Sequence, residues 1–221
     1  MTARTRRFDL IVFDWDGTLY DSTAMITRAI QRACADLGVP VPSDRDASYV
    51  IGMGLIEALQ HAVPGLPRER YNELVLRYRK HYLAMQDEVV LFDGTLAMLH
   101  ALQARNHTLA VATGKSRAGL NEVLHTVQLQ HLFAASRTAD ETASKPHPRM
   151  LLELMAELGV APERTLMIGD TTHDLQLALN AGTPSVAVSY GAHEPSGFAA
   201  LQPLHIAHTV VELHQWLADH A

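Results

Sequence analysis

Two acidic residues follow a short apolar run near the start of the chain. Residues 10–13 are rich in strand formers and too few for a typical core helix, which favours a buried parallel strand. Asp14 and Asp16 come directly after this run, and Gly17 allows a sharp turn. If the extended backbone persists through Trp15, both carboxylates lie on one side of the chain. The pattern predicts a pair of acids at the carboxyl end of a strand, where open α/β sheets bind their ligands.

Two later strand ends also carry polar groups. Beyond residue 107 the sequence alternates between strand and helix patterns, which predicts a parallel sheet with crossover helices. One predicted strand ends in Thr113 and Gly114, and another is followed by Asp170 and Asp174. Because the carboxyl ends of parallel strands open on one edge, we expect these groups to converge with the first acidic pair.

This set of groups suits phosphoryl transfer. Mg²⁺ binds carboxylates together with water and substrate oxygens, and Asp14 with Asp170 can supply them. Thr113, Gly114 and Lys145 offer a hydroxyl, a backbone N–H and an ammonium for the phosphate oxygens. A carboxylate beside the metal can attack phosphorus, giving an aspartyl phosphate. A second acid can protonate the leaving oxygen and later deprotonate water.

Each of these elements has a simpler structural interpretation. Asp170 and Asp174 could cap a helix, and Lys145 alone is more often a surface lysine. Residues 113–116, Thr-Gly-Lys-Ser, imitate the end of a phosphate-binding P-loop, but Leu109 stands where that motif needs its first glycine. The prediction of a phosphoryl-transfer site therefore depends on the combination.

The chain divides into two parts by its periodicity. Residues 21–90 show helical spacing and no strand signal, which predicts an α-helical cap domain inserted after the first strand. Residues 1–20 and 91–221 would form a Rossmann-like parallel sheet core, so the expected fold class is α/β. The connections near residues 20–22 and 87–93 are the expected hinges.

Two local features bear on the ends of this insert. Ser22 is the expected N-cap of the first inserted helix. Residues 93–96 repeat the Asp-Gly-Thr-Leu of the opening segment, but Leu91 stands where the first carboxylate would be. We therefore expect a helix start there and not a second site.

Composition excludes several classes of protein. A formal net charge of −6 gives no basic footprint for nucleic acid, and no segment reaches membrane-spanning length. The single Cys34 is expected to be a packed thiol in a reducing compartment, which predicts a cytoplasmic protein. The 13 histidines are scattered, so we expect most to be solvated, with room for one near the site. The oligomeric state stays open.

Four segments together resemble the haloacid dehalogenase superfamily in its phosphatase branch. They are Asp14-Trp15-Asp16-Gly17-Thr18, Thr113-Gly114-Lys115, Lys145-Pro146 and Gly169-Asp170-Thr171-Thr172-His173-Asp174, in the family's order and approximate spacing. The resemblance spans nearly the whole chain. It implies a Rossmann-like core, a helical cap inserted after the first strand, and Mg²⁺ as cofactor.

The resemblance also implies a role for each matching residue. Asp14 would be the nucleophile, Asp16 the general acid and base, and Thr113 and Lys145 the phosphate ligands, with Lys145 counted among the catalytic residues. The implied metal ligands are the side chains of Asp14 and Asp170 and the backbone carbonyl of Asp16, with Asp174 supporting the metal or Lys145.

Residues 51–55 look most like the cap segment of phosphoglycolate phosphatases, which makes Gly52, Met53 and Gly54 candidate substrate contacts. Gly114 departs from that branch, where many members carry Asn, as do residues 91–94, where a proline-containing return hinge is usual. These departures leave the residues of the chemistry intact and concern the part of the chain expected to select the substrate.

The expected function is an Mg²⁺-dependent phosphatase acting on a small phosphorylated metabolite, with phosphoglycolate as the leading candidate. A β-phosphoglucomutase-like enzyme is the alternative, although Leu55 stands where that family carries an arginine. Asp16 argues against the related dehalogenases and phosphonate hydrolases, which lack the second acid. A binding protein that lost activity is the third reading, and the intact set of acids argues against it.

Overall fold

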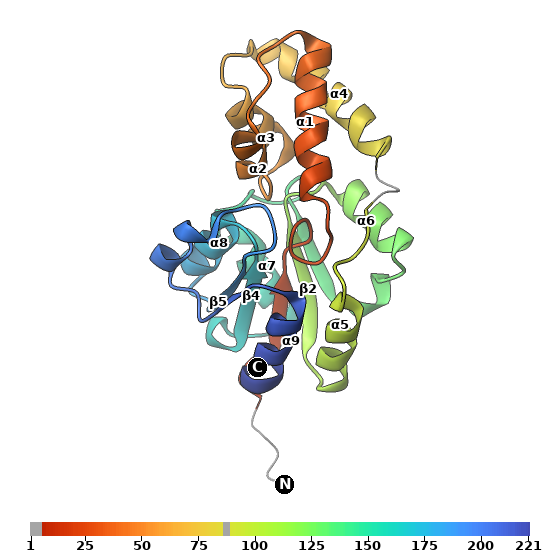
Figure 1. Cartoon of the computed structure of the whole chain (residues 1–221). Coiled ribbons are helices and arrows are strands. Elements are labelled where there is room, and N and C mark those ends of the chain that lie inside the picture. The colour runs from red at the N-terminus through yellow and green to blue at the C-terminus, as the bar shows by residue number, and fades with distance from the viewer. Residues whose placement is uncertain (1–5, 86–88) are drawn as a thin grey trace.

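A six-stranded parallel sheet forms the centre of the computed structural model, which describes residues 6–85 and 89–221 (Figure 1). In the order β3-β2-β1-β4-β5-β6, its strands are Ala135–Thr138, Thr108–Thr113, Leu10–Phe13, Thr165–Gly169, Ser185–Val188 and Ile206–Ala207. β1 pairs with β2 on one side, Val12 opposite Ala110, and with β4 on the other, Val12 opposite Met167. The predicted α/β fold with a Rossmann-like parallel sheet is confirmed.

Helices cover both faces of the sheet because the strands are apolar on both sides. Ile11 and Phe13 pack against α5 (Thr95–Ala104), α6 (Arg117–Thr126) and α9 (Val210–His220). Leu10 and Val12 pack against α7 (Arg149–Leu158) and α8 (Thr172–Ala181). All four residues of β1 are fully buried, as the uninterrupted apolar run predicts.

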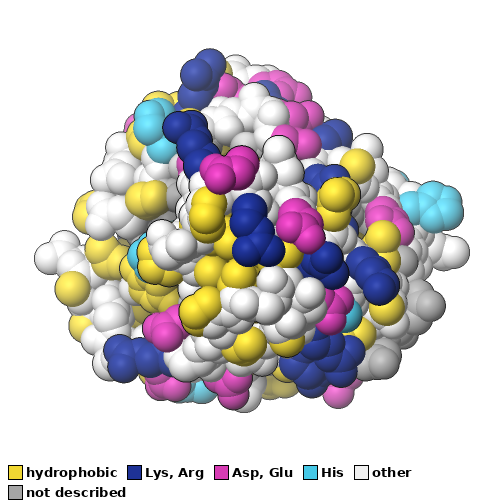
Figure 2. Space-filling view, turned by 90° about the horizontal axis from the view of Figure 1, so that it is seen from above, with side chains coloured by type: hydrophobic (Ala, Val, Ile, Leu, Met, Phe, Trp, Pro, Cys, Tyr) yellow, Lys and Arg dark blue, Asp and Glu magenta, His cyan; other side chains and the backbone are white. Residues whose placement is uncertain are grey.

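Four further helices lie together above the carboxyl edge of the sheet (Figure 1). They are α1 (Thr23–Leu37), α2 (Asp44–Tyr49), α3 (Leu55–Ala62) and α4 (Tyr71–Leu83). We call this part the helical insert; it buries an apolar cluster of its own, which includes Cys34, Leu59 and Leu74. Seen from above, acidic, basic and apolar side chains are interspersed over the surface (Figure 2).

The other regular elements within residues 6–85 and 89–221 are short 3₁₀ turns. They span Arg68–Arg70, Gln130–Leu132, Pro162–Arg164, Pro195–Gly197 and Ala199–Leu201. Gly94 takes a φ of +86° directly before α5, so the repeated Asp-Gly-Thr-Leu segment is a helix start, as expected. The second expected hinge lies partly outside the described residues. No helix in the described ranges has both the length and the apolar content needed to cross a bilayer.

The first strand spans Leu10–Phe13, as the apolar run predicts. The extended backbone does not continue through Trp15, because the Trp15 carbonyl accepts N–H groups from the next turn, including those of Leu19 and Tyr20 at 3.0 Å. β3, at Ala135–Thr138, follows a 3₁₀ turn. Its half-buried, polar sequence carries little periodic signal.

Candidate active site

Three carboxylates meet at the carboxyl edge of β1 and β4. Asp14 follows β1, and its N–H donates to the carbonyl of Ile168 in β4 at 2.9 Å. Asp170 follows β4, and Asp174 lies in the first turn of α8. One ligand oxygen from each lies within 4.8 Å of the other two, and all three side chains are buried. The adjacency of the two parallel strands therefore produces the predicted convergence.

Lys145 lies inside this acidic group. Its Nζ is 2.7 Å from Oδ1 of Asp14 and 2.6 Å from Oδ1 of Asp174. Burial opposes the charged form of the lysine, but the two carboxylates outweigh it and raise the pKa of Lys145 above its ordinary value. The lysine is therefore a fixed ammonium in a closed site and not a surface residue.

The ammonium of Lys145 does not fully offset the cost of burying these carboxylates in their charged form. Burial raises the pKa of Asp14 well above its usual value, and Lys145 offsets only part of that shift. Burial and, after it, the Asp174 carboxylate raise the pKa of Asp170 to about 7, against hydrogen bonds from Ala192 N at 2.7 Å and Thr18 Oγ1 at 2.8 Å. A further positive charge beside Asp14 and Asp170 would stabilise their charged forms.

The donor set fits Mg²⁺. Oδ2 of Asp14 is buried and has no hydrogen-bond partner among the described residues. Carboxylate oxygens are the hard ligands that Mg²⁺ prefers, and Asp14 and Asp170 can supply them. Gly17 and Gly191 lie so close to Asp170 that a Cβ on either would overlap its carboxylate. The absence of a side chain at these two glycines therefore leaves room for the carboxylate of Asp170.

Asp174 both caps a helix and supports the site. Its Oδ2 accepts the N–H of Thr171 at 3.1 Å, and the Thr171 side chain accepts the Asp174 N–H, which makes a capping box at α8. Its Oδ1 contacts Lys145. The two interpretations of this residue are therefore compatible, because each uses a different oxygen.

The side chain of Asp16 contacts a different set of residues from the three clustered acids. Its Oδ1 accepts the hydroxyl of Ser22 at 2.6 Å and lies 3.0 Å from Nζ of Lys115. Ser22 precedes α1, but its φ of −110° and ψ of −7° give no side-chain cap. Ser22 therefore stands at the expected N-cap position, but its side chain does not cap the helix, since its hydroxyl is directed to Asp16.

The end of β2 carries the predicted phosphate-binding pair beneath the helical insert. Thr113 is buried, and its Oγ1 accepts the backbone N–H of Lys115 at 3.2 Å. A Cβ on Gly114 would lie 2.6 Å from the carbonyl oxygen of Gly52 and would overlap that of Met53. The loop between α2 and α3 therefore rests directly on the sheet edge.

The same loop and the end of α2 make further contacts with the core. The N–H of Gly54 donates to Oγ of Ser144 at 2.8 Å. The carbonyl of Tyr49, at the end of α2, lies 2.9 Å from Nε2 of both His173 and His193. These contacts place the candidate substrate residues Gly52, Met53 and Gly54 above the acids.

Sequence reasoning missed the partners supplied by distant elements. His173 and His193 are both buried beside the acidic cluster, where one histidine at most was expected. Burial lowers the pKa of each imidazole. Ser144 and Tyr49 carry no motif that could have revealed them, because each reaches the site from another part of the fold.

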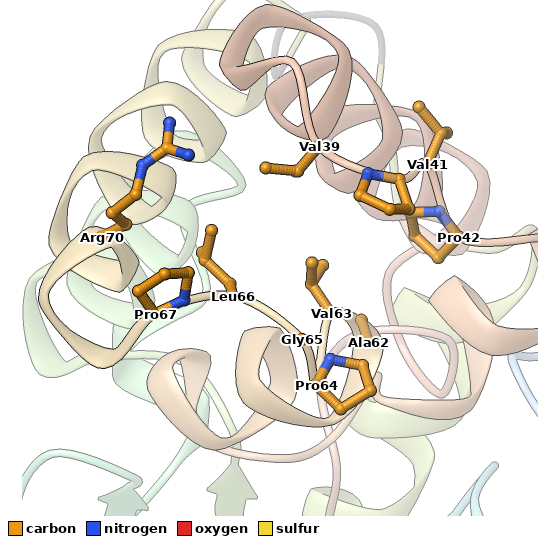
Figure 3. Close-up of a pocket in the computed structure, with 11 residues that line it drawn as sticks. Val39, Val41, Pro42, Ala62, Val63, Pro64, Gly65, Leu66, Pro67 and Arg70 are labelled. Atoms are coloured by element: carbon orange, nitrogen blue, oxygen red, sulfur yellow. The ribbon is translucent and has the colours of Figure 1, made fainter.

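A separate cavity of about 470 Å³ lies in the helical insert (Figure 3). Apolar side chains such as Val39, Val63 and Leu66 line it together with Arg70. None of the acids or of the other predicted site residues lines this cavity, so it is not the candidate active site.

Comparisons with known proteins agree with this geometry. A model of the haloacid dehalogenase-like hydrolase family matches residues 11–188. A probable phosphatase IndB of Dickeya dadantii is 36% identical over 92% of this chain and 91% of its own length. A 5′-nucleotidase of Pseudomonas aeruginosa is 33% identical over 97% of both chains, and a phosphoglycolate phosphatase of Aliivibrio fischeri is 32% identical over 88% and 89%.

A solved structure described as a predicted phosphoglycolate phosphatase from Haemophilus somnus superposes with a TM-score of 0.86. It is 26% identical and covers 96% of this chain and 99% of that one. The chain belongs to the haloacid dehalogenase-like hydrolases, as its motifs indicate. Its phosphatase relatives mark it as a phosphoric monoester hydrolase of the phosphoglycolate phosphatase-like branch.

Proposed function

We propose that this protein is an Mg²⁺-dependent phosphatase that hydrolyses a small phosphorylated metabolite through an aspartyl phosphate. The observation that carries the proposal is the buried carboxylate of Asp14, which lies near Asp170: its Oδ1 contacts the Lys145 ammonium and its Oδ2 has no hydrogen-bond partner among the described residues. A carboxylate oxygen in this position is available for attack on phosphorus. Bound Mg²⁺, held by Asp14 and Asp170, would neutralise phosphate charge.

The reaction has two steps at one carboxylate. Asp14 attacks phosphorus and the bond to the ester oxygen breaks, while Asp16 gives that oxygen a proton. Water then attacks the aspartyl phosphate, Asp16 takes the proton of the water, and phosphate leaves with Asp14 restored. Lys145 and Thr113 hold the phosphate oxygens during both steps.

Residues 21–90 act as the cap in this proposal. Support comes from the loop between α2 and α3, in which Gly52 and Met53 lie against Gly114, and from the low exposure of Asp16, which is 7%. Such enclosure excludes water from the transfer step and favours a small leaving group. Phosphoglycolate is therefore the leading candidate, ahead of the nucleotides that the name of one relative suggests. The single buried Cys34 supports a cytoplasmic setting.

The experiment is a phosphate-release screen of the purified chain with Mg²⁺. Phosphoglycolate, other small acid and polyol phosphates, hexose phosphates and nucleoside 5′-monophosphates form the substrate panel. We expect the highest kcat/KM among the small esters, complete loss of release in EDTA, and recovery on adding Mg²⁺. Equal release in EDTA would contradict the proposal. Interconversion of hexose phosphates without net release would favour the phosphomutase alternative.

A further inference from the structure

Lys115 joins the helical insert to the candidate general acid. Its Nζ lies 3.0 Å from Oδ1 of Asp16 and donates to the hydroxyl of Tyr82 at 2.8 Å. Lys115 follows the end of β2 in the core, whereas Tyr82 lies near the end of α4 in the insert. The two-step reaction proposed above gives this lysine no task.

The contacts of Asp16 fix one of its oxygens and spare the other. Ser22 and Lys115 both reach Oδ1, which leaves Oδ2 without a side-chain donor among the residues that the structure describes. Two donors on one oxygen restrict the rotation of the carboxylate. The second oxygen is then held in a fixed direction and is free to exchange a proton with a reacting oxygen.

Lys115 is built into the structure as a cation. Its side chain is 9% exposed and that of Asp16 is 10% exposed, so water screens the pair weakly. The Nζ also lies 4.9 Å from the centre of the Tyr82 ring, within range of a cation–π contact.

We propose that Lys115 is a positioning residue for proton transfer by Asp16, and that Tyr82 holds it in place only while the insert is seated on the core. The inference rests on the proposed phosphatase reaction. Movement of α4 away from the core would remove both the hydroxyl and the ring of Tyr82, so the Lys115 ammonium would keep only its contact with Asp16. Proton transfer would then depend on closure over a substrate.

The test uses Lys115→Met, which keeps the length of the side chain and removes its charge. Lys80→Met is the matched control, because Lys80 is exposed on the same helix as Tyr82. Formation of the aspartyl phosphate is followed by rapid quench with two substrates. β-Glycerophosphate needs a proton on its leaving oxygen, and p-nitrophenyl phosphate does not.

We expect Lys115→Met to slow phosphorylation by β-glycerophosphate about 100-fold, and phosphorylation by p-nitrophenyl phosphate less than about threefold. Lys115→Arg should recover part of the loss, since it restores the positive charge. Lys80→Met should behave as wild type with both substrates. Equal slowing with both substrates, or a change in KM alone, would overturn the inference and make Lys115 a ligand of the phosphate or of the leaving group.

Tyr82→Phe tests the contact with the insert. Tyr71→Phe is its control, since the Tyr71 hydroxyl donates to the Val63 carbonyl at 2.7 Å within the insert. Tyr82→Phe should give a smaller loss with the same leaving-group dependence, and should add nothing to Lys115→Met in the double variant. Additive losses would overturn the coupling. If Lys115→Met does not fold, Tyr82→Phe alone decides the test.

The failure of this inference differs from failure of the proposed function. Wild-type protein that forms no phosphoenzyme with either substrate would overturn the phosphatase proposal. Wild-type protein that forms it normally, with Lys115→Met indistinguishable from Lys80→Met, would overturn only the role of Lys115. Thermal unfolding of each variant shows that the comparison is made between folded proteins.

Discussion

The backbone carbonyl of Met53 occupies the space that a side chain on Gly114 would fill. Gly114 follows β2 in the core, and Met53 lies between α2 and α3 in the helical insert. A residue without Cβ at the strand end therefore lets the insert rest on the sheet edge. This contact gives a structural meaning to the glycine that departs from the Asn common in the phosphoglycolate phosphatase branch.

Gly114→Ala should impair closure of the insert. The added methyl group meets backbone carbonyls, which cannot move aside as a flexible side chain could. We expect kcat/KM for a small alkyl phosphate to fall about tenfold or more, because water is no longer excluded from the site. Steady-state kinetics with Mg²⁺ measures this effect.

Gly119→Ala is the matched control for that substitution. An added Cβ there meets only Oγ of Ser116, at 3.4 Å, and Gly119 lies inside α6. Activity should be unchanged, and the free energy of unfolding should rise by about 0.5–1 kcal/mol, the usual gain from replacing a helical glycine with alanine. Wild-type kinetics for Gly114→Ala would show that activity does not depend on the close contact between this loop and Gly114.

Asp14→Asn should abolish turnover without unfolding the protein. The change keeps the size of the side chain but removes both the attacking charge and a candidate Mg²⁺ ligand, so kcat should fall by several orders of magnitude. Because burial disfavours the Asp14 charge, its removal should leave the unfolding temperature near that of wild type.

Asp93→Asn is the control for the nucleophile. Asp93 is exposed and belongs to the second Asp-Gly-Thr-Leu sequence, so it tests the same chemical change outside the site. It should retain full activity. Mass spectrometry of the quenched wild-type reaction should place the phosphoryl group on Asp14, and an adduct on another residue would contradict the assignment.

Asp16→Asn should separate the two steps of the reaction. p-Nitrophenolate leaves without a proton, so the variant should still form the aspartyl phosphate and release a burst of about one equivalent, followed by a slow steady rate. An alkyl phosphate should give almost no burst. Rapid-quench time courses measure both. Equal slowing of formation and breakdown for both leaving groups would mean that Asp16 only positions the site.

His107 should make folding stability depend on pH. Its ring is buried with Nδ1 2.9 Å from the Phe8 carbonyl, and burial lowers its pKa below the ordinary value of 6.5. The unfolded chain therefore takes up a proton at higher pH than the folded chain does. The stability supplied by the neutral ring is lost as pH falls below about 6.5, down to the folded pKa.

His107→Asn tests this dependence, because its amide can still donate to the Phe8 carbonyl but does not titrate. Urea unfolding at about pH 7.5 and pH 5.5 should show a smaller drop in the free energy of unfolding for the variant than for wild type. The exposed His100→Asn should leave the wild-type drop unchanged. An equal drop in wild type and His107→Asn would refute a contribution from His107.

Local sequence was sufficient to predict the central strands of the sheet and to identify the acids that follow them. The uninterrupted apolar run of β1 is the direct consequence of burial on both sheet faces, so it is visible without a structure. The positions of Asp14 and Asp170 follow from where their strands end, and parallel pairing brings any such ends to one edge. The family motifs could be recognised for the same reason.

Only the tertiary structure decided which groups touch. Ser22 carries the local signature of a helix cap, yet its hydroxyl donates to Asp16 because the chain enters α1 without the extended backbone that a cap requires. The contact of Lys115 with Tyr82 joins residues from the core and the insert. Periodicity and spacing describe one element at a time, whereas these partners depend on how the insert lies on the sheet edge.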